Sequence, residues 1–384
     1  LYLWFLSIEE RGWQNMLRAY RTEINPSFEQ RQTINQTIGT CRWMYNKFIE
    51  TNQNFHKTGQ SYMNGYAFSK WMNNVYLPNN PDKHWIKQSA SKAVKQSIMN
   101  AHRAYQTFFK NKKGYPKFKK KSGIGSYYLI GTIHVQRHRI QLPKLGWIKL
   151  KEKSYIPTNN IKSATIVKEY DRYYVSVLVD QLPSPIFKPK QTDGIGIDLG
   201  LKEAVFTPSG VKIRSFKTNQ TIVKLDKSLK RQQRKLSRKK KGSHNWYKQL
   251  LKLQRIYRRI KNIKRNIKHK GILSIVRTNP QFITIENLNI KGMMRNKRLA
   301  NSFQQIGLGY IVEWLKIKCQ DYGIELRQVD RFYLSSQICS DCGYIQPMPL
   351  NQRTYHCHHC GMIKDRDINA SINLKQATDY TVIV

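Results

Sequence analysis

Two Cys-x-x-Cys pairs near the end of the 384-residue chain constrain its local fold more strongly than any other feature. Cys339 and Cys342 form the first pair, Cys357 and Cys360 form the second, and 14 residues separate the two. Each pair can bind one ion from a tight turn, and a hairpin between them can bring four sulfurs together around Zn²⁺. The spacing therefore predicts a structural zinc site, with reduced thiolates in a cytoplasmic protein favoured over disulfides.

Three histidines lie beside the second pair, and two further cysteines lie far from it. His356, His358 and His359 could replace a sulfur ligand, although four thiolates already complete a closed structural site. Cys41 and Cys319 stand in amphipathic segments and are expected in the hydrophobic core. Because a closed zinc site stabilises a small fold and performs no chemistry itself, any catalysis must lie elsewhere in the chain.

The charge balance predicts the partner. The chain has 68 Lys and Arg residues against 23 Asp and Glu residues, which gives a formal net charge of +45. So much positive charge repels itself unless a polyanion offsets it, and nucleic acid is the expected polyanion. A membrane surface is the alternative, but no apolar run reaches the roughly 18 residues of a membrane span, and the basic residues are spread along the chain instead of beside an anchor.

Changes in periodicity divide the chain into parts. Residues 1–15 lack the basic start and cleavage site of a signal peptide, so they are expected to be an extension ahead of a natural start at Met16. Apolar residues at helical spacing dominate residues 28–110. Short β-branched segments follow, as in a small barrel, up to a Pro-containing linker at 182–192. Beyond the linker, "DGIGIDLGLKEAVFTPSG" predicts a buried strand, a tight turn and a second strand, and "IVEWLKIKCQDYG" predicts a helix that ends at Gly323. Together, the alternating β and α patterns predict a mixed sheet flanked by helices.

Residues 217–270 contain 21 Lys and Arg residues and a single acid, Asp226. Apolar residues recur there at helical spacing, which predicts an amphipathic basic hairpin or a long helix pair: Leu250, Leu253, Ile256, Ile260, Ile263 and Ile267. Candidates for phosphate contact come from this run and from an earlier basic segment: Arg231, Arg234, Lys235, Arg238, Lys239, Lys240, Lys241, Lys117, Lys119, Lys120 and Lys121. For each of them a solvated charge with little effect is the alternative, and the sequence does not divide them between RNA and DNA.

Carboxylates are scarce in this chain, and several stand in unusual places. Asp198 lies in the apolar segment "IGIDLG", Glu286 ends the apolar segment "FITIENL", and Asp367 opens the helical pattern "DINASINL", with Asp365 two residues before it. Singly, each could be a turn acid, a strand-end acid or a helix cap. Together, two strand carboxylates and one at a helix start make an oxygen cage suited to Mg²⁺. Two such ions, about 3.5–4 Å apart, would support phosphodiester cleavage.

These segments resemble a known family. The resemblance covers residues from about 16 to 375 and rests on an ordered set of motifs: "YRTEINPSFEQ…IGTCRWMYN", "GYPKFKKK", "GIGIDLGLKEAVF", "ITIENLNIKGM", "SSQICSDCG" and "CHHCGMIKDRDINASINL". The set resembles the TnpB proteins of bacterial insertion sequences, which are RNA-guided DNA nucleases related to the type V CRISPR effectors. The "IGIDLG" strand alone is also typical of ATPases of the actin and hexokinase type, so the ordered set carries the resemblance.

The resemblance implies a multidomain α+β fold. Its parts are an N-terminal wedge β-barrel with an inserted helical recognition lobe, and a C-terminal RNase H-like (RuvC) α/β domain with an inserted zinc-binding module. In this sequence the barrel is expected at 16–34 and 111–185, the lobe at 35–110, the RuvC-like domain at 186–338 and 362–384, and the zinc module at 339–361.

The resemblance also implies the site residues and the partners. Asp198, Glu286 and Asp367 are the expected catalytic residues and ligands of two Mg²⁺ ions, with Asp365 as the alternative third ligand. Zn²⁺ is the expected structural metal. The expected partners are a guide RNA from the transposon end and double-stranded target DNA beside a transposon-adjacent motif, where base pairing supplies the sequence specificity.

Two other functions remain open at this point. The chain could be a nuclease-inactive RNA-guided DNA-binding repressor, although such relatives are expected to lose a catalytic acid and all three are present here. It could also be a transposase that joins DNA strands. The expected location is the cytoplasm of a bacterium, in association with the nucleoid.

Overall fold

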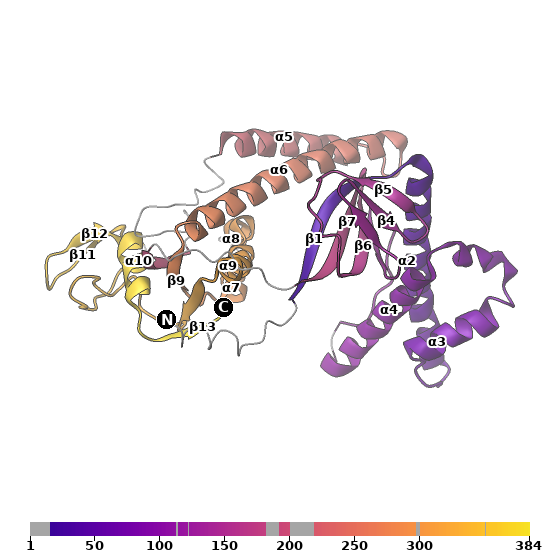
Figure 1. Ribbon diagram of the computed structural model, residues 1–384, viewed down its shortest axis with the longest axis horizontal. Helices are drawn as coiled ribbons and strands as arrows, with labels where there is room; N and C mark the ends of the chain where they lie inside the picture. Colours follow the sequence, from indigo (N-terminus) through magenta and orange to yellow (C-terminus); the bar gives the residue numbers. More distant parts are fainter. Residues whose placement is uncertain are drawn as a thin grey trace. The chain divides into compact units, whose positions relative to one another are not determined.

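A computed structural model describes residues 16–112, 114–121, 123–181, 192–199, 219–296, 300–349 and 351–384 (Figure 1). The chain divides into two compact units, Leu1–Pro183 and Ser184–Val384. The extension expected at 1–15 lies outside the described residues, as does almost all of the linker expected at 182–192. No helix within the described ranges is long and apolar enough to cross a membrane.

A seven-stranded antiparallel sheet forms the centre of the N-terminal unit, in the order β2-β6-β7-β1-β5-β4-β3. Its strands are β1 (Met16–Asn25), β2 (Ile124–Leu129), β3 (His134–Gln136), β4 (Arg139–Leu142), β5 (Gly146–Leu150), β6 (Ile161–Glu169) and β7 (Arg172–Gln181). Alternate residues of β7, such as Val175 and Val177, are fully buried, as the period-2 pattern predicts. Among the described residues β2 and β3 are the edge strands, so the expected barrel is observed as a sheet and its closure stays a prediction.

The same unit contains the helical part of the chain. It comprises α2 (Phe28–Lys57), α3 (Gly65–Trp71), a π-helical turn η1 (Met72–Tyr76), a 3₁₀ helix η2 (Pro81–Gln88) and α4 (Ser91–Asn111). The helical segment begins at Phe28, as the helical spacing over residues 28–110 predicts, and Ser27 and Gln30 form a reciprocal capping box there. The first half of α2 packs on the sheet through Ile34, and the second half joins an aromatic core with α3 and α4 through Phe48.

The C-terminal unit is built on a four-stranded mixed sheet, as the β/α order predicts. Its strands are β8 (Thr192–Ile197), β9 (Pro280–Ile285), β10 (Glu325–Val329) and β13 (Tyr380–Val382), in the order β13-β10-β9-β8. β8, β9 and β10 are parallel, and β13 runs antiparallel to β10. A second strand was expected just after β8, within "DGIGIDLGLKEAVFTPSG", but it falls outside the described residues.

The same unit contains a set of helices. They are α5 (Gln220–Ser237), α6 (His244–Val276), α7 (Ile290–Met293), α8 (Ala300–Ile306), α9 (Leu308–Tyr322) and α10 (Arg366–Gln376). The expected basic hairpin is confirmed as α5 and α6, which pack side by side (Figure 1). α9 ends at Gly323, which adopts φ 59°, as its position after the last periodic residue predicts.

A short hairpin and a glycine place α10 on the sheet. β11 (Thr354–His356) pairs with β12 (Ile363–Asp365), and β12 leads directly into α10. A Cβ on Gly196 would lie 2.0 Å from the backbone oxygen of Ser371, so only glycine allows α10 to approach β8 this closely. The end of the cysteine-containing hairpin is thereby fixed against the strand that precedes Asp198.

Candidate functional site

The four cysteines of the two Cys-x-x-Cys pairs come together in one cluster. Their sulfur atoms all lie within 4.8 Å of one another, with Cys339 Sγ 3.7 Å from Cys360 Sγ and Cys342 Sγ 3.6 Å from Cys357 Sγ. Four sulfurs at about 2.3 Å from a tetrahedral zinc ion would be about 3.8 Å apart. The cluster therefore has the donors and the spacing to hold a structural zinc ion.

Each cysteine pair sits on the same type of turn. The N–H of Gly343 donates to the Cys339 carbonyl at 2.9 Å, and the N–H of Gly361 donates to the Cys357 carbonyl at 3.0 Å. Both glycines have left-handed backbones, with φ values of 75° and 74°, which a Cβ would oppose. Within the described part of the chain, none of the three nearby histidines joins the group of ligand atoms, so the four thiols remain the only ligand set there.

Local hydrogen bonds prepare one thiol for metal binding. Burial raises the pKa of the Cys357 thiol, but the backbone of Cys360 and His359 and the neighbouring thiols lower it by more, to about 6. Because the thiolate is the form that binds a metal, Cys357 is poised as a ligand near neutral pH. His359 itself stacks on Tyr344, with ring centroids 5.5 Å apart.

Asp198 and Glu286 lie side by side at one edge of the C-terminal sheet. Ile197 and Ile285 are partners in the parallel pair β8–β9, and the two acids are the next residue on each strand. Because the carboxyl ends of parallel strands meet at the same edge, this register brings together two side chains that are 88 positions apart in the sequence.

Burial and mutual repulsion perturb the two strand acids. Desolvation raises the pKa of Asp198 to about 7, with further increases from the charges of Glu286 and Asp367 and smaller decreases from Arg366 and Arg353. Desolvation also raises the pKa of Glu286, against a hydrogen bond of 2.5 Å from Ser335 Oγ to Glu286 Oε1. Acids held together in this way are typical of a site that binds a cation.

The two candidate third acids have different roles in α10. Asp365 is the N-cap, and its Oδ1 accepts from the N–H groups of Asp367 and Ile368 at 2.9 and 3.2 Å. Asp367 lies in the first turn, and its charge acts on Asp198. Asp367 Oδ1 lies 3.2 Å from Arg366 Nη2. The structure thus places the charge of Asp367 near Asp198 and uses Asp365 to cap the helix.

The three acids do not form a ready-made metal cage. Oxygens bound to one Mg²⁺ at about 2.1 Å can be at most about 4.2 Å apart. Among the described residues, only the four cysteines have ligand atoms that all lie within 4.8 Å of one another. Asp367 instead contacts Arg366 and Arg353, the latter at 3.5 Å, and it would have to turn from them to share an ion with Asp198.

Several residues of this site were not singled out from the sequence. They are Ser335, Arg353 and Arg366, together with two buried asparagines of α10, Asn369 and Asn373. The asparagines are four positions apart within an apolar helical pattern, and this spacing places them on one helix face. Two polar residues on a face that should be buried were a signal available in the sequence.

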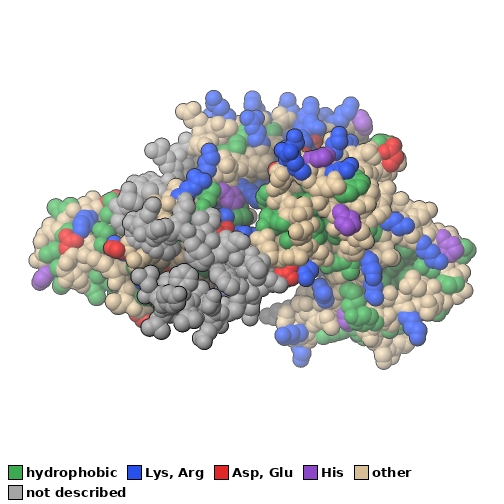
Figure 2. Space-filling model, viewed as in Figure 1, with side chains coloured by type: hydrophobic (Ala, Val, Ile, Leu, Met, Phe, Trp, Pro, Cys, Tyr) green, Lys and Arg blue, Asp and Glu red, His purple; other side chains and the backbone are tan. Residues whose placement is uncertain are grey.

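Ten of the eleven basic candidates for phosphate contact are exposed, and Lys239 is half-buried. Seven lie in the second half of α5 and the turn that follows it, where Figure 2 shows Lys and Arg side chains gathered along one border of the molecule. Lys119 differs from the rest, because its Nζ lies 3.9 Å from the centroid of the Tyr45 ring and desolvation lowers its pKa. The four lysines of residues 117–121 belong to the N-terminal unit, and the other seven belong to the C-terminal unit.

Three family profiles match parts of the chain. Residues 16–61 match a profile described as "Helix-turn-helix domain", residues 175–297 one described as "Probable transposase", and residues 309–374 one described as "Cas12f1-like, TNB domain". In this structure residues 16–57 form strand β1 and the single long helix α2, and not two helices joined by a turn.

Relatives and a solved structure match almost the whole chain. An Escherichia coli (strain K12) protein named "Putative RNA-guided DNA endonuclease InsQ" is 28% identical over 94% of this chain and 92% of its own length. A Streptomyces pristinaespiralis protein with the same descriptive name is 29% identical over 95% of this chain and 90% of its own. The structure titled "Cryo-EM structure of the Cas12f1-sgRNA-target DNA complex" is similar in fold, with a TM-score of 0.50 and 13% identity over 96% of this chain and all of that one.

The fold is therefore a mixed α+β, multidomain fold similar to that of Cas12f1, with a four-cysteine cluster in its C-terminal unit. The transposase-type profile, the relatives and the shared fold agree on one assignment. These matches support the resemblance of the chain to the TnpB family.

Proposed function

We propose that this protein is an RNA-guided DNA endonuclease of an insertion sequence, with a RuvC-like nuclease site in its C-terminal unit. The observation that carries the proposal is the meeting of three acids from distant parts of the sequence. Asp198 and Glu286 follow neighbouring parallel strands, and Asp367 acts on Asp198 from the first turn of α10. The names of the relatives support the same activity.

Asp198, Glu286 and Asp367 would hold two Mg²⁺ ions, because carboxylate oxygens are the ligands that this hard cation prefers. When bound, the ions supply an activated water and stabilise the leaving oxygen of a phosphodiester. Asp365 is the weaker candidate for the third ligand, since its Oδ1 already accepts two N–H groups of the helix.

Neighbouring side chains orient these acids. The hydroxyl of Ser335 donates to Glu286 and fixes one of its oxygens. Arg353 and Arg366 contact Asp367 and offset part of the negative charge when no cation is bound. With a cation bound, the same guanidinium groups would turn from Asp367 to contact a DNA phosphate beside the acids.

Guide RNA and double-stranded target DNA are the proposed partners. The basic turn after α5, residues 238–241, and the lysines of 117–121 would contact phosphates, while base pairing with the guide supplies sequence. The N-terminal sheet would serve as the wedge barrel, α2 to α4 as the recognition lobe, and the zinc-stabilised hairpin as the module inserted before Asp367. The guide would come from the transposon end, and the target would lie beside a transposon-adjacent motif.

The test begins with the RNA that copurifies with the full-length protein. That RNA is sequenced, and DNA matching its variable end is offered with and without Mg²⁺. We expect a defined RNA and guide-matched cleavage that requires Mg²⁺. Asp198→Ala should abolish cleavage and leave the RNA complex intact, whereas Asp330→Ala, at an exposed acid just after β10, should cleave normally.

Other results would identify other functions. Guide-matched binding without cleavage by the wild-type protein would indicate a repressor. Joined products from transposon ends would indicate a transposase. Random or absent RNA would contradict RNA guidance, and full activity of Asp198→Ala would refute the assignment of the metal site.

A further inference from the structure

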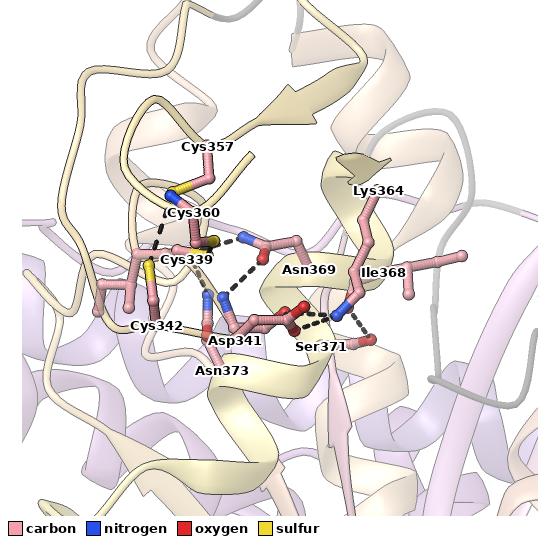
Figure 3. A network of polar contacts seen from close by, with 12 residues as sticks. Cys339, Asp341, Cys342, Cys357, Cys360, Lys364, Ile368, Asn369, Ser371 and Asn373 are labelled. Carbon is pink, nitrogen blue, oxygen red and sulfur yellow. Dashed lines mark hydrogen bonds and ion pairs between the residues drawn. The ribbon is translucent and has the colours of Figure 1, made fainter. Parts of the chain in front are cut away.

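Two buried asparagines of α10 connect the four-cysteine cluster with the carboxylate site. Asn369 and Asn373 are 0% and 2% exposed, and together they are named the asparagine clasp. Figure 3 shows both side chains facing the chain segment that leads into Cys339. A buried amide is costly unless each polar atom has a partner, so the contacts of the clasp indicate what it holds.

The clasp binds the backbone of the segment 335–340. Asn369 Nδ2 donates to the Ile338 carbonyl at 2.7 Å, and Asn369 Oδ1 accepts from the N–H of Ser340 at 2.9 Å. Asn373 Nδ2 donates to the carbonyls of Ser335 and Ile338, both at 2.7 Å. Ile338 and Ser340 flank Cys339, so the clasp fixes the backbone of the first cysteine turn.

The other end of the same segment holds a proposed catalytic acid. Ser335, whose carbonyl accepts from Asn373, donates its hydroxyl to Glu286. On its opposite side α10 is fixed against Gly196 of β8, two residues before Asp198. The helix that carries Asp367 is therefore held between the strand of one acid and the segment that orients another.

The second hairpin completes the link. Lys364 of β12 donates to Ser340 Oγ at 3.1 Å and forms an ion pair with Asp341, between the cysteines of the first pair. β12 continues directly into α10 at Arg366. A zinc ion bound by both cysteine pairs would thus restrain the segment 335–340, which orients Glu286, and the strand β12, which leads into the helix of Asp367.

We propose that the asparagine clasp is a positioning element that couples occupancy of the cysteine site to the geometry of the carboxylate site. Loss of zinc would loosen the segment 335–340 and release Glu286 from Ser335, so the acids would bind Mg²⁺ less well. The coupling is a linkage between two sites and is reciprocal. This inference rests on the proposed function only for its cleavage measurement.

The first test uses Asn373→Leu and Ser335→Ala in the full-length protein with its guide RNA. Asn373→Leu keeps the size of the side chain but removes the donor to the carbonyls of Ser335 and Ile338. Ser335→Ala removes only the hydroxyl that donates to Glu286. We expect the Mg²⁺ concentration for half-maximal cleavage to rise about tenfold in both variants, the usual effect of losing a partner behind a metal ligand. Guide RNA binding should stay within about twofold of wild type.

Two variants control for a general loss of packing between α10 and the segment 335–340. Tyr333→Phe removes a hydroxyl that donates to the Asn373 carbonyl at 3.0 Å, so it weakens the same interface without freeing the segment 335–340. Ser335→Thr keeps the hydroxyl that Glu286 needs. Both should retain the Mg²⁺ dependence of the wild type, and a shift in Tyr333→Phe equal to that of Asn373→Leu would overturn the positioning role.

The second test measures hydrogen exchange and does not depend on cleavage. Cys360→Ser, which removes one zinc ligand, should speed exchange at Ser340 and in the peptide that contains Glu286. In a protein that already carries Asn373→Leu, Cys360→Ser should raise the exchange rate at Glu286 only slightly. The hydrogen bonds from Asn373 that connect the cysteine site with Glu286 are already absent in that protein.

The outcomes separate this inference from the proposed function. Wild-type cleavage together with an unchanged Mg²⁺ requirement in Asn373→Leu and Ser335→Ala would overturn the clasp and leave the nuclease assignment standing. If the wild-type protein does not cleave, the nuclease assignment fails and the exchange test decides alone. Unchanged exchange at Glu286 in Cys360→Ser would then overturn the coupling, and faster exchange would support it.

Discussion

Replacing Asp198 by Asn should stabilise the protein in the absence of added Mg²⁺ while it destroys the proposed metal site. The Asp198 carboxyl is desolvated and lies near two other acids, which raises its pKa from 3.8 to about 7. In the unfolded chain the same group ionises near its ordinary pKa. Ionisation is therefore costlier in the folded state, and this group's contribution to stability is fully present below pH 4 and is lost as the pH rises to 7.

The magnitude follows from the pKa difference. Three units at about 1.4 kcal/mol each set an upper limit of about 4 kcal/mol at pH 8. A unit of 150–250 residues gains about 2–4 °C in unfolding temperature per kcal/mol, so the shift should be about 16 °C at most. Asn keeps the size of the side chain and carries no charge at any pH, so the gain should shrink towards zero as the pH falls to 4.

Thermal unfolding of wild-type protein and Asp198→Asn at pH 4 to 8, without added Mg²⁺, is the measurement. Chelators are left out because they would also remove zinc from the cysteines. Asp330→Asn, at an exposed acid after the neighbouring strand β10, is the matched control and should not shift the unfolding temperature. Added Mg²⁺ should stabilise the wild-type protein more than Asp198→Asn. An Asp198→Asn protein that unfolds at or below the wild-type temperature at pH 8 would refute the argument from desolvation and repulsion.

Three further predictions follow from the same structure. Cys357→Ser should reduce bound zinc, unfolding temperature and cleavage together; a stable variant with unchanged zinc content, measured by elemental analysis, would contradict the four-cysteine site. Gly196→Ala places a Cβ 2.0 Å from the backbone oxygen of Ser371. It should destabilise the C-terminal unit by about 1–3 kcal/mol in denaturant unfolding and abolish cleavage. The control Gly39→Ala, whose Cβ would have no atom within 4 Å, should stabilise α2 by up to about 1 kcal/mol. Replacing the basic residues of 238–241 by Gln should reduce the slope of log affinity against log salt for duplex DNA by about 0.9 for each phosphate that is no longer neutralised, and an unchanged slope would mean that these charges only face solvent.

Local patterns in the sequence were sufficient for much of the fold. The turn at Gly323 was predictable because glycine alone adopts its left-handed backbone easily, and the basic hairpin of α5 and α6 followed from apolar residues at helical spacing. The start of α2 at Phe28 agrees with the helical spacing that begins at residue 28, and the structure adds the capping box of Ser27 and Gln30 that fixes it. Residues 1–15 and the strand expected after β8 lie outside the described residues, so they stay predictions.

The sequence by itself determined which residues could carry chemistry. Two cysteine pairs predict zinc because two ligands three positions apart can share one ion, and acids at the ends of apolar strands are conspicuous because burying them is costly. These are local relations, and they depend on spacing and on the chemistry of single side chains.

Only the tertiary structure decided how those residues meet. The register of β8 against β9 sets Asp198 beside Glu286, and α10, held close to Gly196, carries Asp367, whose charge acts on Asp198. The different tasks of Asp365 and Asp367, and the link from Asn373 through Ser335, arise from contacts between segments far apart in the chain. Such contacts depend on packing of the whole C-terminal unit, and no local pattern of residues records them.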